Sequence, residues 1–508
     1  MPLVRPIDTF LNAITMYRLV LYGLIGLSGI AILFGFLGIL PFNGIQLLIS
    51  LSIVSAVGYI TKKIFAKLFK AQTNYESSVI TSLILFLIVA PVNSIEDAII
   101  SSGISAIAIA SKYFFAIDKK HIFNPAAIAV FLAGLLGFGN GIWWIGSVVM
   151  LPFVVIVGLL IVRKIRRFHL LFAFILTAIP TIILFNLKNG VSPQDSFIQV
   201  FASWPIIFFG TVMLTEPLTM PARKKLYIPF GMLVGVLFGS QFHIGPLFSS
   251  PELALVVGNI YGYIVGPKYK LFLHLKERIQ IAPNIYEFIF TKSGKFNFLP
   301  GQYLEWTLPE KSADSRGNRR YFTIASSPTN ENVVLGVRID TQRSSKFKRT
   351  LLDMQAGDAI VASQLSGDFV LPHDQKNEVV FIAGGIGITP FRSMVEYLLD
   401  TGEKRNVVMF YTASHKEEFV YMDIFKKAQD MGWLTMVYVI TKEENAPSDW
   451  AGEKGHLTEE ILKKYQSADG VETYYISGPN AMVEAYKHLL HSMKVQHKRI
   501  VTDYFPGF

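Results

Sequence analysis

The sequence RYFTIASSP, residues 320–328, reads as a β-strand that runs into a turn. Side chains two apart on a strand share a face, so Arg320 and Phe322 should point the same way, with Thr323 beside them. A guanidinium can hold a pyrophosphate, an aromatic ring can stack on another ring, and a hydroxyl can hydrogen-bond to the ring edge. The stretch therefore predicts a flavin-binding strand, although an exposed structural strand has a similar composition.

The residues around this strand predict a small antiparallel barrel. Short strand patterns such as 285–290 and 333–339 alternate with turn residues. Pro-Gly-Gln at 300–302 is a turn into a strand, and Gly-Asp-Phe at 367–369 closes the barrel. Free amides and side chains before a helical pattern predict a phosphate site, with an ordinary serine cap as the alternative, at Ser344, Ser345 and Lys346.

From Glu378 the pattern changes to alternating strands and helices. The strand at 379–383 runs into Gly-Gly-Ile-Gly-Ile-Thr-Pro at 384–390 and then into an amphipathic helix. Glycines let the backbone turn tightly and approach a pyrophosphate at the start of a helix. The candidate nucleotide contacts in this turn are Gly385, Gly387, Thr389 and Pro390.

Three further apolar runs, at 407–411, 435–440 and 473–477, read as buried parallel strands. The last of them leads into a second glycine turn that opens a helix. The residues of interest at this turn are Ser477, Gly478, Pro479, Asn480 and Met482. The pattern predicts an α/β nucleotide-binding domain.

In this order, Pro-Gly-Gln, Arg-x-aromatic-Thr, Gly-Asp-Phe, Gly-Gly-Ile-Gly-Ile-Thr-Pro and Ser-Gly-Pro resemble the ferredoxin–NADP reductase superfamily over about residues 270–508. The resemblance implies an FAD-binding β-barrel domain at 268–372 and an NAD(P)-binding α/β domain at 373–508. Both nucleotides would then bind to this half of the chain.

The same resemblance implies roles for single residues. Arg320 would hold the FAD pyrophosphate, Phe322 would stack on the isoalloxazine where the family usually has Tyr, and Thr323 would sit near N5. Residues 344–346 would bind phosphate, and both glycine turns would receive the nicotinamide nucleotide. The family often has Cys at the position of Ser477, and its terminal aromatic residue covers the flavin. The implied catalytic residues are Thr323, Ser477 and Phe508, and the further implied cofactor contacts are Tyr321, Val337 and Arg338.

The choice between NADH and NADPH depends on one loop. Ser414, His415 and Lys416 could bind a 2′-phosphate, but the acidic Glu417 and Glu418 follow directly. The pattern leans slightly towards NADH.

The composition of the whole chain is that of a membrane protein. Its 508 residues are 51% hydrophobic and only 17% charged, and the apolar excess lies before about Gly266. There is no cysteine, which excludes disulfides, zinc ribbons, iron–sulfur clusters and thiolate nucleophiles. The net charge of +10 comes partly from basic clusters that flank apolar runs, which indicates a membrane surface rather than nucleic acid. No metal site is predicted.

Ten apolar runs have roughly the length of membrane spans. Basic clusters lie on the same side of all of them, so both termini are expected in the cytoplasm and the chain in a bacterial-type inner membrane. No cleavable signal peptide is evident. The connection between the third and fourth runs is so short that broken or re-entrant helices are an alternative there. The runs are 17–40, 44–61, 77–93, 95–112, 124–140, 142–162, 168–187, 199–215, 226–243 and 252–266.

Polar residues at the ends of these runs are candidate contacts of a membrane cofactor: His121, Asn124 and Glu216. An asparagine followed by proline is also common at the start of an ordinary helix, where the asparagine caps the first turn. Ser-Lys-Tyr, His-Ile-Phe-Asn-Pro-Ala-Ala and Met-Leu-Thr-Glu-Pro-Leu-Thr, in this order, resemble the D subunit of the Rnf complex and the B subunit of sodium-translocating NADH:quinone reductase. That resemblance implies flavin in the membrane. The loop at 189–196 lacks a threonine for covalent attachment, so non-covalent FMN or riboflavin is expected.

Together these features predict hydride transfer from NAD(P)H to FAD, followed by electron transfer into the membrane domain. The acceptor would be a quinone or an extracytoplasmic flavoprotein. Two alternatives remain: an NADH:quinone oxidoreductase, with or without ion coupling through Glu216, and a transporter regulated by an accessory reductase. Haem is disfavoured because the membrane half lacks paired histidines at two depths.

Overall fold

The computed structural model describes residues 7–8, 10–11, 14–69, 75–117, 120–221, 223–266, 270–292, 294, 296–308, 318–342, 344–372, 374–375, 378–465 and 472–503. The chain divides into two compact units, Met1–Lys270 and Leu271–Phe505.

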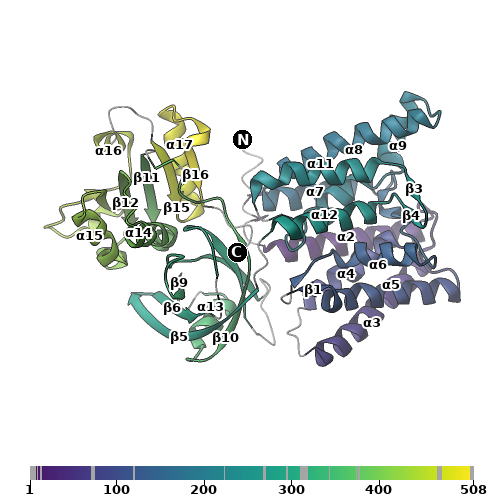
Figure 1. The fold of residues 1–508 in the computed structure, drawn as a ribbon, viewed down its shortest axis with the longest axis horizontal. Coiled ribbons are helices and arrows are strands. Elements are labelled where there is room, and N and C mark those ends of the chain that lie inside the picture. The colour runs from purple at the N-terminus through teal and green to yellow at the C-terminus, as the bar shows by residue number, and fades with distance from the viewer. Residues whose placement is uncertain are drawn as a thin grey trace. The chain divides into compact units, whose positions relative to one another are not determined.

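The first unit is helical, and its helices pack side by side (Figure 1). Many of them begin after a side chain that caps the first turn, as Thr15, Asn43, Ser94, Asn124, Ser192 and Ser250 do. The helices are α2 (Met16–Phe36), α3 (Gly44–Leu68), α4 (Tyr75–Ile88), α5 (Ile95–Phe114), α6 (Pro125–Leu135), α7 (Leu151–Ile165), α8 (Phe168–Lys188), α9 (Pro193–Ala202), α10 (Ile206–Phe208), α11 (Tyr227–Gly239) and α12 (Pro251–Val265). The short hairpins are β1 (Ala116–Ile117) with β2 (Lys120–His121) and β3 (His243–Ile244) with β4 (Leu247–Phe248).

Every one of the ten predicted runs overlaps a helix or a pair of helices, but few of these helices have the length of a full span. By length and composition α2, α3 and α8 could each cross a membrane. Residues Pro193–Ala202 and Ile206–Met213 could form a fourth, bent by 56° at its break. A π-helical turn at Phe209–Met213 continues α10.

The bounds of several predicted runs differ from those of the helices, and two of them differ in the part between α6 and α7. The run 124–140 gives a helix that ends at Leu135, and the run 142–162 gives one that begins at Leu151. Between these helices the chain has no α-helix and is only partly buried, and Gly141 bridges back to Val89. Apolar composition predicts burial, but it does not separate a helix from buried irregular backbone.

The outer surface of the first unit is apolar. Phe172, Leu176 and Leu184 of α8 are 57%, 71% and 66% exposed. Large apolar side chains at this exposure are unfavourable in water, and they indicate that another apolar medium covers them.

The second unit begins with the expected antiparallel barrel. Its strand order is β8-β7-β10-β5-β6-β9, and the Ala325 N–H donates to the Val334 carbonyl where the two edge strands approach. Trp306, Phe288 and Leu335 are fully buried in it. The strands are β5 (Lys270–Ala282), β6 (Ile285–Thr291), β7 (Tyr303–Thr307), β8 (Arg319–Thr323), β9 (Asn332–Arg338) and β10 (Ala359–Ser366), and α13 spans Lys346–Asp353.

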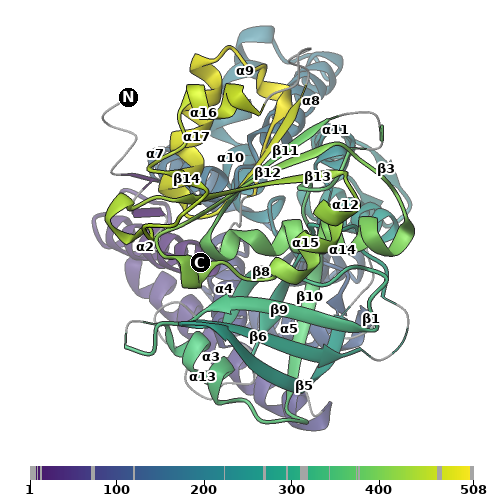
Figure 2. The same ribbon diagram turned by 90° about the vertical axis from the view of Figure 1, so that its left-hand side faces the viewer.

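The rest of this unit is a parallel sheet covered on both faces, as the buried apolar runs predict (Figure 2). Helices α14 and α15 pack on one face and α16 and α17 on the other. The sheet order is β14-β13-β12-β11-β15-β16. The strands are β11 (Val379–Gly384), β12 (Val407–Ala413), β13 (Leu434–Ile440), β14 (Glu453–Lys454), β15 (Thr473–Ser477) and β16 (Ile500–Thr502), and the helices are α14 (Thr389–Thr401), α15 (Met422–Asp430), α16 (Glu459–Lys464) and α17 (Asn480–Ser492).

Candidate active site

Strand β8 presents its side chains in the alternation that the sequence predicts. The Arg320 guanidinium lies 5.3 Å from the centre of the Phe347 ring, and the Phe322 ring lies 5.9 Å from the same ring. Tyr321 points the other way, where its hydroxyl donates to Glu305 Oε2 at 2.8 Å. Arg320 and Phe322 therefore share one face of the strand.

The predicted phosphate residues lie beside this face. Phe347, which Arg320 and Phe322 both contact, is the second residue of α13. Ser345 caps this helix by accepting from the Lys348 N–H, and the Ser344 N–H donates to the Asp340 carbonyl. The structure thus brings residues 344–346 to the strand, and it also shows the ordinary serine cap.

Two further predicted contacts are Thr323, the last residue of β8, and Val337, the second-last residue of β9. Thr323 is buried and pairs with Tyr303 of β7, while Val337 is buried opposite Tyr286 of β6. Both side chains are therefore packed in the barrel.

Arg338 extends from the barrel to the nucleotide domain. Its guanidinium forms an ion pair with Glu418, whose other carboxylate oxygen accepts from the Ser414 N–H at 3.2 Å. A Cβ built on Gly385 would lie 3.9 Å from Arg338 Nη1. Arg338 therefore lies between the first glycine turn and the loop expected to select NADH or NADPH.

The two glycine turns meet at the carboxyl ends of the adjacent strands β11 and β15. Gly385 has a φ of +51°, which favours glycine. A Cβ on Gly387 would lie 2.4 Å from the Ser477 carbonyl oxygen, and one on Gly384 would lie 2.3 Å from Met482 Sδ. Only glycine permits this packing, and it makes one continuous surface of both predicted nucleotide turns.

The remaining predicted residues of these turns take local structural positions. Thr389 and Pro390 open α14, and the Thr389 hydroxyl donates to the Ile386 carbonyl at 3.2 Å. Pro479 and Asn480 open α17. These helix starts direct free backbone amides towards the surface on which a pyrophosphate is expected.

Ser477 has a partner that the sequence did not indicate. Its buried hydroxyl donates to Asp503 Oδ2 at 3.1 Å, and the Asp503 N–H donates to the Ile476 carbonyl. Asp503 is the last described residue, so the predicted catalytic Phe508 lies outside the described part of the chain.

Burial changes the acidity of several groups in this unit. Burial raises the pKa of the Glu287 carboxyl, and the nearby Arg392 guanidinium partly opposes that effect. Burial likewise raises the pKa of Tyr475 to about 12, and its hydroxyl donates to the Val370 carbonyl. Neither group belongs to the predicted flavin or nucleotide contacts.

In the first unit the structure brings all three predicted polar residues together. The Asn124 side-chain amide donates to Glu216 Oε2 at 2.8 Å, and His121 Nε2 lies 3.6 Å from Glu216 Oε1. Two further residues complete this polar cluster. Thr219 donates to Glu216, and Asn259 accepts from the Asn124 backbone N–H at 2.7 Å.

Sequence reasoning did not single out Thr219 or Asn259 as site residues; for Asn259, a polar residue inside the apolar run 252–266 was a usable signal. It also missed Glu252, which is buried in the first turn of α12. Its Oε1 accepts from the Trp143 indole at 2.6 Å. Among the described residues no group of three or more His, Asp or Glu side chains is arranged to hold a metal ion.

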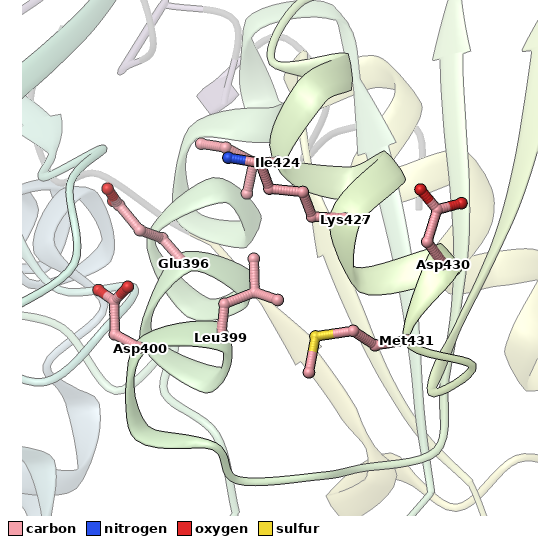
Figure 3. A pocket seen from close by; sticks show the side chains of 7 residues that line it. All are labelled: Glu396, Leu399, Asp400, Ile424, Lys427, Asp430 and Met431. Carbon is pink, nitrogen blue, oxygen red and sulfur yellow. The ribbon is translucent and has the colours of Figure 1, made fainter.

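An open groove of about 450 Å³ lies between α14 and α15 (Figure 3). It is away from the glycine turns and has both acidic and apolar walls. Its lining residues are Glu396, Leu399, Asp400, Ile424, Lys427, Asp430 and Met431.

Comparison with known proteins agrees with this geometry. Residues 381–488 match the family model of the oxidoreductase NAD-binding domain. Because this match lies in the second unit, we call that unit the reductase module. The match indicates that the reductase module binds a nicotinamide nucleotide, and the relatives that the chain resembles are reductase subunits or components.

Two relatives illustrate the similarity. The chain is 29% identical over 201 residues to the F subunit of the Na⁺-translocating NADH-quinone reductase of Mannheimia succiniciproducens, covering 37% of this chain and 49% of that relative. It is 28% identical over 218 residues to the reductase component of propane 2-monooxygenase of Mycolicibacterium goodii, covering 42% of this chain and 60% of that protein. The chain thus spans only about half the length of the curated relatives it matches.

Among solved structures, the cytochrome P450 reductase GcoB of Amycolatopsis is similar with a TM-score of 0.41 and 24% identity. The similarity covers 47% of this chain and 70% of GcoB.

Proposed function

We propose that the chain is a membrane-bound flavoenzyme that oxidises NAD(P)H at the reductase module and passes the electrons through the helical unit. The acceptor would be a quinone or an extracytoplasmic flavoprotein. The observation that carries the proposal is the presence, in one chain, of an oxidoreductase NAD-binding domain and a polar cluster inside an apolar helical unit.

The residues of the reductase module fit FAD and a nicotinamide nucleotide. The buried Arg320 lies beside the start of α13, where a pyrophosphate would be held, and Gly385 leaves open the space that a Cβ would fill. When bound, FAD would supply hydride acceptance and the release of single electrons.

The contribution of the polypeptide is mainly positioning. Phe322 would stack on the flavin ring, Thr323 would hydrogen-bond near its reacting edge, and Ser477 would face the nicotinamide. Phe508 would cover the ring. No side chain needs to act as an acid or base, because holding the reacting atoms about 3–3.5 Å apart accounts for most of the acceleration.

NADH is the favoured donor. The Glu418 carboxylate accepts from the Ser414 backbone N–H, at the start of the loop that would have to bind a 2′-phosphate. A carboxylate at that place repels a phosphate group, whereas it can accept from a ribose hydroxyl.

The helical unit is proposed to cross a bacterial-type inner membrane ten times, with both termini in the cytoplasm. The exposed apolar face of α8 supports lipid contact, and the overlap of every predicted run with helices supports the count. The irregular backbone at Val89 is compatible with a membrane because protein surrounds it.

The polar cluster is the proposed place of a non-covalent FMN or riboflavin, or of the quinone itself. Asn124, Glu216 and His121 come from two separate segments, and each could turn a donor or acceptor towards a ring with heteroatoms. The name of the Mannheimia relative favours a second candidate, an NADH:quinone oxidoreductase in which Glu216 couples electron transfer to an ion.

Flavin analysis of the purified full chain tests the proposal. We expect FAD together with FMN or riboflavin, and faster anaerobic bleaching by NADH than by NADPH in stopped-flow absorbance. A single FAD and no other flavin would remove the membrane flavin and leave direct transfer to quinone. If the helical unit is a transporter, NADH-reduced chain should not be reoxidised by any quinone.

A further inference from the structure

One face of α14 is bonded to the segment that follows the flavin strand β8. Arg392 Nη1 donates to the Ala325 carbonyl at 2.7 Å, and the Ser393 hydroxyl donates to the Ser326 carbonyl at 2.7 Å. These bonds join the nucleotide domain to the barrel within one compact unit. We call residues 325–330 and 392–396 the domain seam.

Glu396 is the centre of this set of bonds. Its Oε2 accepts from the Ser327 backbone N–H at 2.7 Å, and its Oε1 accepts from the Asn330 side-chain amide at 2.9 Å. Arg392, one turn earlier on α14, donates to the same carboxylate at 3.2 Å. One carboxylate thus receives donors from both domains, and hydrogen bonds to a charged group are the strong ones.

The interior of the domain seam holds the Arg392 side chain firmly. Arg392 is 7% exposed, and its guanidinium lies 4.8 Å from the centre of the Tyr421 ring. Glu287 of β6 is also close enough to interact electrostatically with Arg392. A buried guanidinium with partners on several elements has little freedom to move.

Along the chain, the domain seam lies close to the flavin strand β8 and to the first glycine turn. Ala325 is the second residue after Thr323, and Arg392 is the second residue after Pro390. A shift at the domain seam therefore reaches the flavin strand and the nucleotide turn across only two residues on each side.

We propose that Glu396 and Arg392 are positioning residues for hydride transfer: they fix the glycine turn at 385–390 relative to the flavin strand. The inference depends on the proposed NAD(P)H oxidation. Neither residue touches the expected reacting atoms, and each acts through the backbone of residues 325–327 or through Asn330.

The substitution Glu396→Gln tests the inference with little change in shape. A glutamine has a single acceptor oxygen, so at least one of its present donors loses its partner. We expect the rate constant for flavin reduction at saturating NADH to fall about 10- to 100-fold, since a displacement near 1 Å can cost about that much. The dissociation constant for NADH should change less than about threefold, because the glycine turns themselves are intact.

The matched control is Asp430→Asn. Asp430 lies on α15 across the groove from Glu396 (Figure 3). Its carboxylate pairs with Lys426 on its own helix at an exposed site. The control makes the same chemical change a short distance away, and its reduction rate should equal that of the wild type.

Two spectroscopic readouts separate positioning from a general loss of structure. In the full chain, rates are normalised to bound FAD, and the long-wavelength charge-transfer absorbance of the nicotinamide–flavin pair is recorded. The kinetic isotope effect with C4-deuterated NADH is measured as well. We expect a weaker absorbance band and a larger isotope effect for E396Q, neither of which arises from partial unfolding alone.

Asn330→Ala is the second variant, because it removes only one donor from the barrel side. It should give a smaller loss of the same kind. If NADH reduces the wild-type flavin and both variants keep the wild-type reduction rate and absorbance band, the inference is wrong and the proposed function stands. A wild-type flavin that neither NADH nor NADPH reduces overturns the proposed function and this inference with it.

Discussion

The substitution Gly387→Ala should separate the two nucleotide turns. The added Cβ would lie 2.4 Å from the Ser477 carbonyl oxygen and 2.6 Å from Gly478 Cα. Ordinary contacts between such atoms begin about 1 Å further apart, and both neighbours are backbone atoms that cannot rotate away. The turn after β15 must therefore move, which should cost about 1–3 kcal/mol of stability as overpacking does.

The functional effect should exceed the effect on stability. Ser477 would move by roughly the 1 Å that separates productive from poor hydride geometry, so flavin reduction by NADH should slow about 100-fold. Stopped-flow absorbance gives the rate, and thermal unfolding gives the stability. The control is Gly29→Ala, where nothing lies within 4 Å of the new Cβ. A wild-type reduction rate in Gly387→Ala would refute the packing of the two turns.

Three further predictions address other contacts. Glu418→Gln should reduce, about tenfold, the ratio by which the ADP-ribose fragment of NADH binds more tightly than the 2′-phosphorylated fragment of NADPH. The exposed neighbour Glu417→Gln should leave this ratio unchanged, and equal effects of the two substitutions would contradict the role of Glu418. Because burial raises the pKa of Glu287, the folded state holds its proton more tightly. Its contribution to stability is present below about pH 4.5 and is lost as pH rises through the raised pKa. The free energy of unfolding in urea, measured over this pH range, should fall less for Glu287→Gln than for the wild type. Equal falls for the two proteins would contradict the raised pKa. Asn259→Leu leaves the buried Asn124 N–H without its acceptor, which should cost about 1–3 kcal/mol and lower the retained membrane flavin; unchanged thermal unfolding would count against the polar cluster.

The spacing of residues along the sequence was sufficient to predict which side chains share a face of the flavin strand β8. A period of two places Arg320 and Phe322 on one face, and the structure shows both against Phe347. The strand and glycine-turn order also predicted the parallel sheet, because buried parallel strands read as continuous apolar runs.

Contacts between distant segments could not be predicted in the same way. Glu396 and Ser327 are bonded across 69 positions, and Asn124 and Asn259 across 135. Spacing along the chain carries no information about such pairs, since they depend on how the elements pack. Helix ends in the first unit were missed for a related reason: after Ile88 the chain stays apolar because Val89 and Val92 are buried, not because it is helical.

The central claim is that reducing equivalents taken up at the reductase module reach an acceptor in the membrane. The most direct measurement is anaerobic absorbance of the full chain in liposomes, first with limiting NADH and then with a lipid-soluble quinone. The account predicts bleaching of the flavin followed by full recovery of its colour, and slower recovery in Glu216→Gln. Flavin that NADH bleaches and no membrane-side acceptor recolours would contradict it.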